Sequence, residues 1–365
     1  MLTIVAMSGG VDSSSAARLL RDAGHEVLGL TLRLWRTSRL SEDYIERAKR
    51  VCEALGIPHR TVDLREEFGR TIVDEFCAEY LRGRTPNPCV LCNPLIKVPA
   101  LLREAEACGA RRVATGHYAR VVARPDGGCE LRRGADRRKD QSYVLYRLGQ
   151  AQLRRIAFPL GERYKRDVRE QARQFWPWDE LPAESQEVCF LPPGGYPEFI
   201  RERVSRHPEA RRFLRPGRVV DTQGNVLARH RGIFNFTIGQ RRRLGFAAGK
   251  PMYVVRIEPR TDTVVVAERA ETYRRRFTVT DVTWCSGESP LAEGRPAVRA
   301  AVKIRYTHPA AEATIRAAGD QVQVAFEAPQ HAVTPGQSAV FYDDDIVLGG
   351  GIIDRVMDDA DPETP

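Results

Sequence analysis

The 365-residue sequence has no apolar run of about 18 residues, the length that a membrane-spanning helix needs, so we expect no membrane partner. Residues 1–6 lead directly into a glycine loop and lack the basic start and longer apolar stretch of a signal peptide. Eight cysteines are too few for a disulfide-stabilised scaffold. These absences predict a cytoplasmic protein, in which closely spaced cysteines favour catalytic or metal-binding roles.

Acidic residues are in the minority, because 48 Asp and Glu stand against 57 Lys and Arg and the formal net charge is +9. Such a balance fits a polyanionic partner and fits an arginine-rich proteome equally well. The hydrophobic content of 42% is ordinary for a globular chain with real cores. The length predicts two or three domains.

Short apolar strands alternate with amphipathic helices along the first half of the chain. This alternation is typical of an α/β domain with a doubly wound parallel sheet, which we assign to residues 1–192. The expected strands are 2–6, 26–32, 60–62 and 112–115, and the expected helices are 14–23, 41–55, 66–81 and 94–108.

The pattern of expected elements changes after the proline- and glycine-rich segment Pro192 to Gly195. A helical stretch at 197–214 opens a small central domain, assigned to residues 193–270. Many short strands separated by turn signals then predict a C-terminal β-barrel at residues 271–357. The acidic tail, residues 358–365, is expected to fray.

The segment Ser8-Gly9-Gly10-Val11-Asp12-Ser13-Ser14 joins the first expected strand to the first expected helix. Backbone N–H groups and the positive end of a helix dipole meet there, which makes an anion site. Glycines let the backbone approach phosphate oxygens, and the serine hydroxyls can donate hydrogen bonds. Neither the Walker pattern nor G-x-G-x-x-G is present. The string resembles the loop of the PP-loop ATPases, which hold ATP while it is cleaved between its α and β phosphates.

Two cysteines lie on the segment Thr85-Pro86-Asn87-Pro88-Cys89-Val90-Leu91-Cys92-Asn93. Its prolines and asparagines predict a rigid, non-helical loop. A third candidate is Cys189, and the other five cysteines are interpreted as structural. Zinc is not favoured, because no second C-x-x-C supplies the remaining ligands. Two alternatives stay open: an iron–sulfur cluster on Cys89, Cys92 and Cys189, and thiol exchange chemistry among the same residues.

Further motifs follow in a fixed order: A-T-G-H-Y-A-R at 114–120, K-D-Q-S-Y at 139–143, S-Q-E-V-C-F at 185–190, T-I-G-Q-R-R-R-L-G at 237–245, R-Y at 305–306, T-P-G-Q at 334–337 and L-G-G-G at 348–351. With the glycine loop and the C-x-x-C segment, they make nearly the whole chain resemble the bacterial tRNA-specific 2-thiouridylase family of the PP-loop ATPase superfamily. The resemblance implies an adenine-nucleotide α-hydrolase-like domain followed by the two smaller domains.

The resemblance also implies a reaction. ATP with Mg²⁺ adenylates oxygen 2 of a wobble uridine that has been flipped out of its stack. A persulfide on Cys189 then delivers sulfur, and Cys92 is the nucleophile that resolves the reaction as a Cys92–Cys189 disulfide. Cys89 stands where the family varies between Asp and Cys, as an assisting thiol or a ligand of a [4Fe-4S] cluster. The implied partners are a tRNA with a wobble uridine and a persulfide donor or relay protein.

Binding residues carry over by position. The implied ATP-binding residues are Ala6, Met7, Ser8, Gly9, Gly10, Val11, Asp12, Ser13, Leu32 and Gly116. The implied contacts with the target base are Asn87, Pro88 and Cys89, and those with the rest of the tRNA are His117, Lys139, Asp140, Gln141, Arg305, Tyr306 and Gln337.

The sequence departs from the family at two places. The segment Arg36 to Arg39 replaces a longer acidic stretch, and Pro94 to Val98 replaces the usual K-E-I-K-F. Two rival hypotheses remain: another PP-loop ligase acting on tRNA, which needs no paired cysteines, and a non-catalytic RNA-binding module with a vestigial nucleotide loop.

Overall fold

The structure is a computed structural model that describes residues 1–35, 41–178, 181, 188–192, 194–205, 214–247, 249–291 and 297–357. Three expectations lie outside these residues: the frayed tail at 358–365, the shortened stretch at 36–39, and the first part of the 185–190 motif. Within the described part of the chain, no helix combines the length and the apolar character that crossing a membrane requires.

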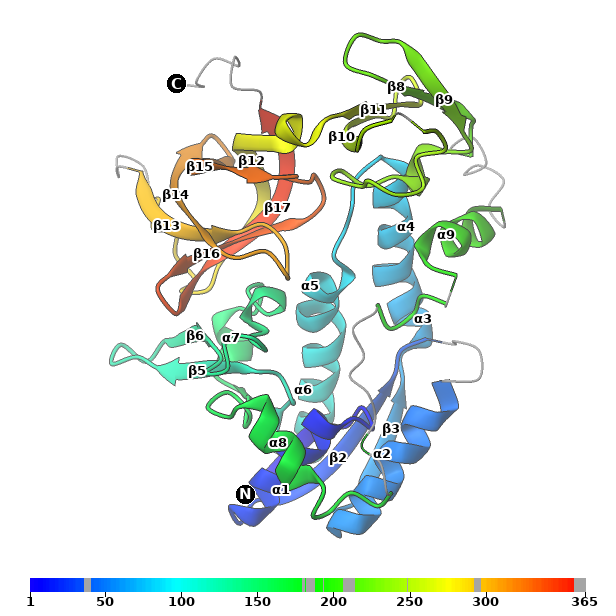
Figure 1. Ribbon diagram of the computed structural model, residues 1–365. Helices are drawn as coiled ribbons and strands as arrows, with labels where there is room; N and C mark the ends of the chain where they lie inside the picture. The colour runs from blue at the N-terminus through cyan, green and yellow to red at the C-terminus, as the bar shows by residue number, and fades with distance from the viewer. Residues whose placement is uncertain are drawn as a thin grey trace.

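A five-stranded parallel sheet forms the centre of the N-terminal domain, in the order β3-β2-β1-β4-β7 (Figure 1). Its strands are β1 (Leu2–Ala6), β2 (Glu26–Arg33), β3 (His59–Asp63), β4 (Arg112–Ala114) and β7 (Ile156–Ala157). Neighbouring residues of β1 enter different cores, because side chains alternate across a strand: Ile4 joins one hydrophobic cluster and Val5 the other.

Helices cover both faces of this sheet. Val5 packs in a cluster with α1 (Val11–Asp22), α2 (Ser41–Leu55) and α8 (Lys165–Ala172), whereas Ile4 packs in a cluster with α4 (Asp74–Leu81) and α6 (Val98–Ala107). The predicted fold class, a doubly wound parallel sheet, is confirmed. Strand β1 pairs with β2 on one side and β4 on the other, so the chain order reverses beside β1. Open parallel sheets bind ligands at such a switch point, at the carboxyl ends of the strands.

The segment predicted as a rigid, non-helical loop is instead largely helical, and that prediction is wrong. Helix α5 (Pro88–Cys92) continues through the π-helical turn η2 (Asn93–Lys97) into α6. Pro88 occupies the first helical position, where a missing N–H is tolerated, and Asn87 caps the helix by accepting from the backbone N of Cys89 at 3.1 Å. The residues interpreted as helix breakers are therefore a helix start.

A second helical segment also contains a π turn. The helix expected at 66–81 consists of α3 (Arg65–Phe68), η1 (Gly69–Val73) and α4. π-helical turns occur frequently at functional sites. Both turns lie in the part of the domain that carries the cysteines.

The central region contains α9 (Tyr196–Ser205) and a four-stranded sheet in the order β10-β11-β8-β9. These strands are β8 (Gly217–Val220), β9 (Val226–His230), β10 (Tyr253–Glu258) and β11 (Thr263–Ala267). They enclose a small core of their own, around Val219, Phe236 and Val264.

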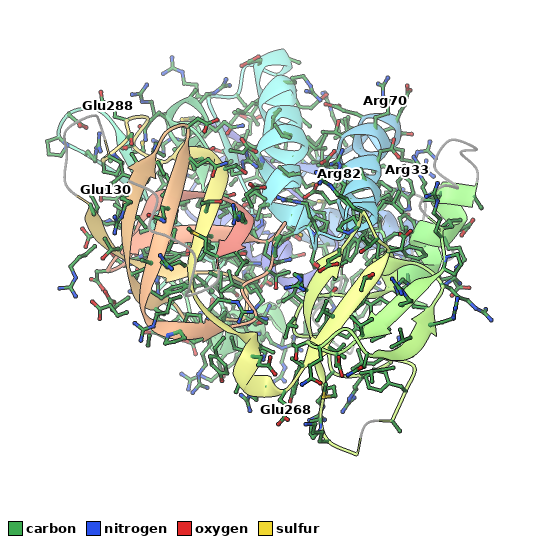
Figure 2. All side chains as sticks on the ribbon, turned by 90° about the horizontal axis from the view of Figure 1, so that it is seen from above. Arg33, Arg70, Arg82, Glu130, Glu268 and Glu288 are labelled. Carbon is green, nitrogen blue, oxygen red and sulfur yellow. The ribbon has the colours of Figure 1, made fainter. Side chains whose placement is uncertain are left out.

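A closed barrel forms the last part of the chain, as predicted. Six strands follow the order β12-β15-β14-β13-β16-β17, and β12 also pairs with β17 to close the ring. They are β12 (Tyr273–Trp284), β13 (Val298–Lys303), β14 (Ala311–Ala318), β15 (Gln321–His331), β16 (Ser338–Asp343) and β17 (Ile346–Met357). Seen from above, the barrel and the central sheet lie side by side (Figure 2).

The barrel is tied to the N-terminal domain by a hairpin that the sequence did not predict. Strands β5 (Ala119–Ala123) and β6 (Cys129–Arg133) belong to the first domain in chain order, and β6 pairs with β17 through Arg132 and Ile346. The short helices α7 (Gln150–Leu153), η3 (Ser142–Val144), η5 (Ile233–Asn235) and η6 (Arg269–Thr272) complete the elements. The proposed domain limits of 192, 270 and 357 stay predictions.

Candidate active site

The glycine loop lies at the carboxyl end of β1, at the switch point of the sheet. Gly10 is the N-cap of α1 and offers no side chain, so the first N–H groups of the helix point toward the loop without a side-chain partner. Ser13 and Ser14 donate from their hydroxyls to the carbonyl of Gly10, at 3.0 and 2.8 Å, and the Ser13 hydroxyl accepts from the backbone N of Ser8 at 3.1 Å. This network shapes an open anion cradle.

Gly9 can only be glycine in this loop. Its φ is +69°, and a Cβ there would lie 2.5 Å from the carbonyl oxygen of Tyr44 and 3.0 Å from Cβ of Arg47. The loop is thus packed directly against the first turns of α2. Two other predicted ATP residues are fixed by backbone contacts: Met7 donates to the carbonyl of Leu30 at 2.8 Å, and the carbonyl of Leu32 accepts from the Tyr44 hydroxyl at 3.2 Å.

Asp12 does not face the cradle as a free carboxylate. The Lys165 ammonium binds both of its oxygens at 2.7 Å, and the Tyr118 hydroxyl donates to one of them at 2.9 Å. Lys165 is 7% exposed, whereas the Asp12 side chain is 36% exposed, so the ammonium is shielded from water and the carboxylate is only partly shielded. Neither Lys165 nor Tyr118 was identified from the sequence, because nothing near either residue links it to a loop more than 100 positions away.

Gly116 joins the loop after β4 to the start of α1. A Cβ on Gly116 would lie 2.7 Å from the backbone N of Ser13 and from the backbone C of Asp12. The next residue, His117, bonds through Nδ1 to the Thr115 hydroxyl at 2.8 Å. Burial and the nearby Lys97 ammonium lower the pKa of His117 to about 3, so the ring is neutral at physiological pH.

The partly buried, neutral ring of His117 predicts a pH dependence of stability. An unfolded histidine has a pKa of about 6.5. Between that value and about 3 the unfolded chain therefore binds more protons than the folded chain, and stability falls as pH falls through this window. At pH 5 this effect costs about 2 kcal/mol relative to pH 7.5. Urea unfolding at both pH values should show a smaller acid-induced loss for His117→Gln than for the parent chain; equal losses would contradict the prediction.

The cysteine residues converge from two distant segments. Cys92 ends α5 and is buried, Cys89 is partly buried one turn earlier, and Cys189 is exposed. Phe190 anchors Cys189: it is 1% exposed and packs edge-on against Phe76 with ring centroids 5.1 Å apart. All three cysteines are free thiols; Cys89 and Cys189 both act electrostatically on Cys92, and Cys89 acts on Cys189.

Lys97 is the functional candidate that the sequence analysis missed. It ends the π-helical turn that follows Cys92, which brings it round to the thiols. Burial disfavours its charge, but Cys92, Cys89 and Cys189 together outweigh burial and raise its pKa. The signal in the sequence was that Lys97 matches the fourth residue of the usual K-E-I-K-F, although the segment Pro94 to Val98 as a whole was interpreted as a departure from the family.

The pKa values of Cys92 and Cys189 are raised in this conformation. Burial raises the pKa of Cys92 to about 12, while the Lys97 charge acts in the opposite direction. Desolvation of the Cys189 thiol raises its pKa as well, again opposed by Lys97. Within the described residues, no group of three or more Cys, His, Asp or Glu side chains is arranged to hold a metal ion.

Two contacts connect the nucleotide loop with the thiols. Gly116 packs against the start of α1 at the loop, and the Lys97 charge contributes to the lowered pKa of His117. On the other side, the Tyr44 backbone packs on Gly9, and after burial the charge of Cys189 is one of the influences that raise the pKa of the Tyr44 hydroxyl. The sulfur residues and the phosphate cradle thus share neighbours on both sides.

Several of the residues expected to contact tRNA make hydrogen bonds within the protein. Asp140 is buried, and its carboxylate accepts from the backbone N atoms of Gly134 and Ser142 and from the Ser142 hydroxyl, at 3.0 to 3.1 Å. The Gln141 side chain accepts from the backbone N of Tyr118 at 3.0 Å. Lys139 lies on the same segment and is partly exposed.

The barrel docks beside the C-x-x-C helix. Gln337 donates to the carbonyl of Thr85 at 2.8 Å, two residues before the Asn87 cap, and the backbone N of Thr85 donates to Pro335 at 2.9 Å. Arg305 donates to the carbonyl of His331 at 2.9 Å. Tyr306 is 39% exposed, packs edge-on against the buried Tyr143, and has the Lys303 ammonium over its ring at 5.5 Å from the centroid.

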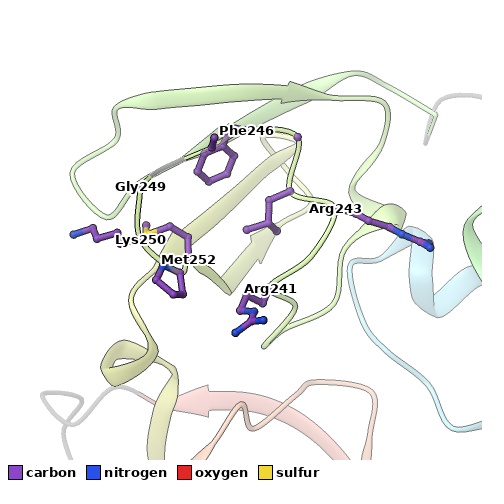
Figure 3. A pocket seen from close by; sticks show the side chains of 10 residues that line it. Arg241, Arg243, Phe246, Gly249, Lys250 and Met252 are labelled. Carbon is purple, nitrogen blue, oxygen red and sulfur yellow. The ribbon is translucent and has the colours of Figure 1, made fainter.

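A cavity of about 730 Å³ lies in the central region, on the loop that carries the 237–245 motif. Figure 3 shows Phe246 and Met252 inside this loop, with Lys250 and Arg243 extending from opposite sides. Arg243 has a φ of +61°, an unusual backbone conformation for a residue with a side chain. The cavity is basic and lies outside the nucleotide and thiol site.

Comparison with known proteins is consistent along the whole chain. Residues 1–193 match the family described as tRNA methyl transferase HUP domain, residues 209–268 the tRNA methyl transferase PRC-barrel domain, and residues 274–353 the aminomethyltransferase beta-barrel domain. A solved structure described as a predicted subunit of tRNA methyltransferase from Methanocaldococcus jannaschii is 19% identical, covers 57% of this chain and 91% of its own, and has a TM-score of 0.34, too low to carry an argument.

Curated relatives are much closer. The tRNA-specific 2-thiouridylase MnmA of Syntrophotalea carbinolica is 46% identical over 355 residues, 96% of this chain and 97% of that protein. The proteins of the same name from Carboxydothermus hydrogenoformans and Geobacter metallireducens are each 44% identical, over 96% and 97% of this chain and 97% of their own lengths. The chain belongs to the tRNA-specific 2-thiouridylase family.

Proposed function

We propose that the chain catalyses ATP-dependent 2-thiolation of the wobble uridine of tRNA, with release of AMP and pyrophosphate. The observation that carries this proposal is the joining of an open phosphate cradle to three thiols around one ammonium group. A PP-loop ligase of another kind would use the cradle without needing the thiols.

The first step activates the base. The cradle of residues 8–10 and the N-terminus of α1 bind the phosphates of ATP with its Mg²⁺, and uracil oxygen 2 attacks the α-phosphorus. The bond between the α and β phosphates breaks and pyrophosphate leaves. Oxygen 2 becomes part of an AMP leaving group, which carbon 2 can then lose.

The second step transfers sulfur. The terminal sulfur of a Cys189 persulfide attacks carbon 2 and displaces AMP. This step joins Cys189 to the base through a disulfide. The Cys92 thiolate attacks Sγ of Cys189, so the 2-thiouridine is released and a Cys92–Cys189 disulfide remains. A thiol reductant reopens that disulfide, and a persulfide donor reloads Cys189. Because burial keeps Cys92 protonated, the Lys97 ammonium has a clear role in stabilising its thiolate.

The test is mass analysis of tRNA nucleosides after incubation with ATP, Mg²⁺ and a persulfide donor. The expected result is exchange of oxygen for sulfur at the wobble uridine, dependent on ATP. ATP- and tRNA-dependent pyrophosphate release without sulfur gain would favour another PP-loop ligase. No such pyrophosphate release at all would favour the non-catalytic RNA-binding module.

Lys97 should matter for sulfur transfer. Lys97→Met removes the charge beside the thiols, so thiolate formation becomes less favourable and thiolation should slow by about 10²-fold. Lys97→Arg keeps the charge and should recover part of the rate. Alkylation of Cys92 and Cys189 by iodoacetamide at fixed pH should slow in the Met variant, and tRNA affinity should stay unchanged.

The matched control is Lys49→Met, which removes an exposed lysine on α2. It should leave both rates within about twofold of the parent chain. Parent-like alkylation and thiolation in Lys97→Met would refute the assigned role.

The iron–sulfur version of the reaction is the less favoured proposal. The three cysteines supply the right donors for a cluster with one open iron site, but their arrangement in the described residues does not fit a metal site. We therefore derive no step through a cluster. Anaerobically purified protein should be colourless, contain no stoichiometric iron, and still thiolate tRNA from a persulfide donor. Brown protein whose activity requires several irons per chain would reverse this preference.

The tRNA would lie across the barrel and the central region. Tyr306 offers an aromatic surface for a base, and the basic rim of Arg241, Arg243 and Lys250 suits backbone phosphates. The ten ATP residues, the contacts of Asn87 to Cys89 with the target base, a relay protein as sulfur donor, and the cytoplasmic location remain predictions.

A further inference from the structure

Helix α2 contributes more than packing to the nucleotide loop. The position of a Cβ on Gly9 lies 3.0 Å from Cβ of Arg47 and 3.2 Å from the backbone N of Ala48. The side chain of Arg47 therefore starts at the loop itself. Ala48, on the next position, is fully buried against the sheet, which leaves Arg47 at the edge of the helix beside the cradle.

Arg47 also has no partner in the described part of the chain. Its Nε is buried and makes no hydrogen bond. Other arginines nearby are paired: Arg50 on the same helix bonds Glu46 at 3.4 Å, and Arg21 on α1 bonds Asp22 at 2.6 Å. A guanidinium N–H withdrawn from water and left unpaired is unfavourable unless an anion arrives to accept from it.

The cradle needs such a cation. Backbone N–H groups and a helix dipole supply only partial positive charge. Lys165 is near the loop, but its ammonium binds both oxygens of Asp12. Within the described residues, Arg47 is thus a cation beside the cradle with no carboxylate bound to it.

We propose that Arg47 is a ligand of the β,γ-phosphates of ATP and of the pyrophosphate that leaves. The proposal rests on the proposed function, in that the cradle must hold ATP. A guanidinium presents a planar fork that matches two phosphate oxygens, so its binding should be specific for the phosphates that AMP lacks. As the bond between the α and β phosphates breaks, negative charge grows on the leaving pyrophosphate, where Arg47 stabilises it.

The experiment compares ATP, AMP and pyrophosphate binding by calorimetry for the full-length chain without tRNA. Arg47→Met keeps the apolar stem and removes the charge. It should weaken ATP and pyrophosphate binding by about tenfold or more and leave AMP binding within about twofold. Arg47→Lys should fall between the two, because it keeps the charge and loses the fork. Arg50→Met, one turn along the same helix, should bind all three ligands as the parent chain does.

Three results would overturn the assignment. If Arg47→Met binds ATP within twofold of the parent chain, Arg47 does not contact the phosphates. Equal weakening of ATP and AMP means that Arg47 only supports the packing of α2 on Gly9. If Arg47→Met does not fold, the Arg47→Lys variant tests the assignment instead. Binding of pyrophosphate by Arg47→Lys with the affinity of the parent chain would exclude a bidentate contact. Failure of the parent chain to bind ATP would instead defeat the proposed function.

Discussion

Cys189→Ser is expected to abolish thiolation of tRNA, with a loss of more than about 10³-fold, because no other residue can carry the transferred sulfur. Activation of the base does not need this thiol. The variant should therefore still release pyrophosphate in the presence of ATP and tRNA, and mass analysis of the nucleosides should find no 2-thiouridine.

Cys92→Ser should stop the same reaction one step later. Sulfur from the Cys189 persulfide can still reach carbon 2, but the Cys92 thiolate that resolves the disulfide between Cys189 and the base is missing. We expect a covalent complex of protein and tRNA that survives denaturation and is released by a thiol reductant. Gel electrophoresis with and without reductant measures it.

Cys108→Ser is the matched control for both variants. Cys108 follows α6, is partly exposed, and accepts from Arg60 at 3.4 Å. Its replacement should leave thiolation within about twofold of the parent chain. Full product formation by Cys189→Ser or Cys92→Ser would point to a ligase that does not use thiols.

Gly9→Ala should have the largest effect on the use of ATP. An alanine at φ +69° is strained by about 1–2 kcal/mol, and its Cβ would meet the Tyr44 carbonyl at 2.5 Å. Because the obstacle is backbone, either the loop or the start of α2 must move, and the cradle loses its shape. We expect kcat/KM for ATP to fall by at least about 10²-fold while tRNA affinity is retained.

Gly24→Ala separates backbone strain from loss of the cradle. Gly24 also has a positive φ, +82°, but nothing lies within 4 Å of its Cβ position. This variant should lose about 1 kcal/mol of unfolding free energy and bind ATP normally. Denaturant unfolding and calorimetry would measure the two properties. Normal ATP binding by Gly9→Ala would show that the tight packing on α2 is not required.

Much of the fold could be predicted because its signals are local. A run such as Leu2 to Ala6, followed by glycines and a helical pattern, predicts a strand, a turn and a helix without knowledge of distant residues. Alternation of such units fixes a parallel sheet, and short strands between turns fix a β domain. The fold class was therefore confirmed, although the hairpin β5–β6 was missed.

The C-x-x-C helix shows where local signals mislead. Proline and asparagine stop helices in most contexts, but Asn87 as cap and Pro88 at the first helical position begin one. Whether Asn87 and Pro88 stop a helix or begin one depends on the residues that follow them. Here α5 continues into the buried core through Ile96 and Leu101, and tertiary burial stabilises the helix.

The sequence by itself determined the nucleotide loop, the order of the domains and the candidate thiols, because each is recognised from residues that are close together in the chain or follow in a fixed order. Only the tertiary structure decided what surrounds them: Lys165 on Asp12, Lys97 amid the cysteines, Gln337 on Thr85, and the unpaired Arg47. Charged groups interact through space over a few ångströms, and the residues that lie within that distance of one another can come from any position in the chain. Pairing, burial and charge at the site are therefore properties of the folded protein.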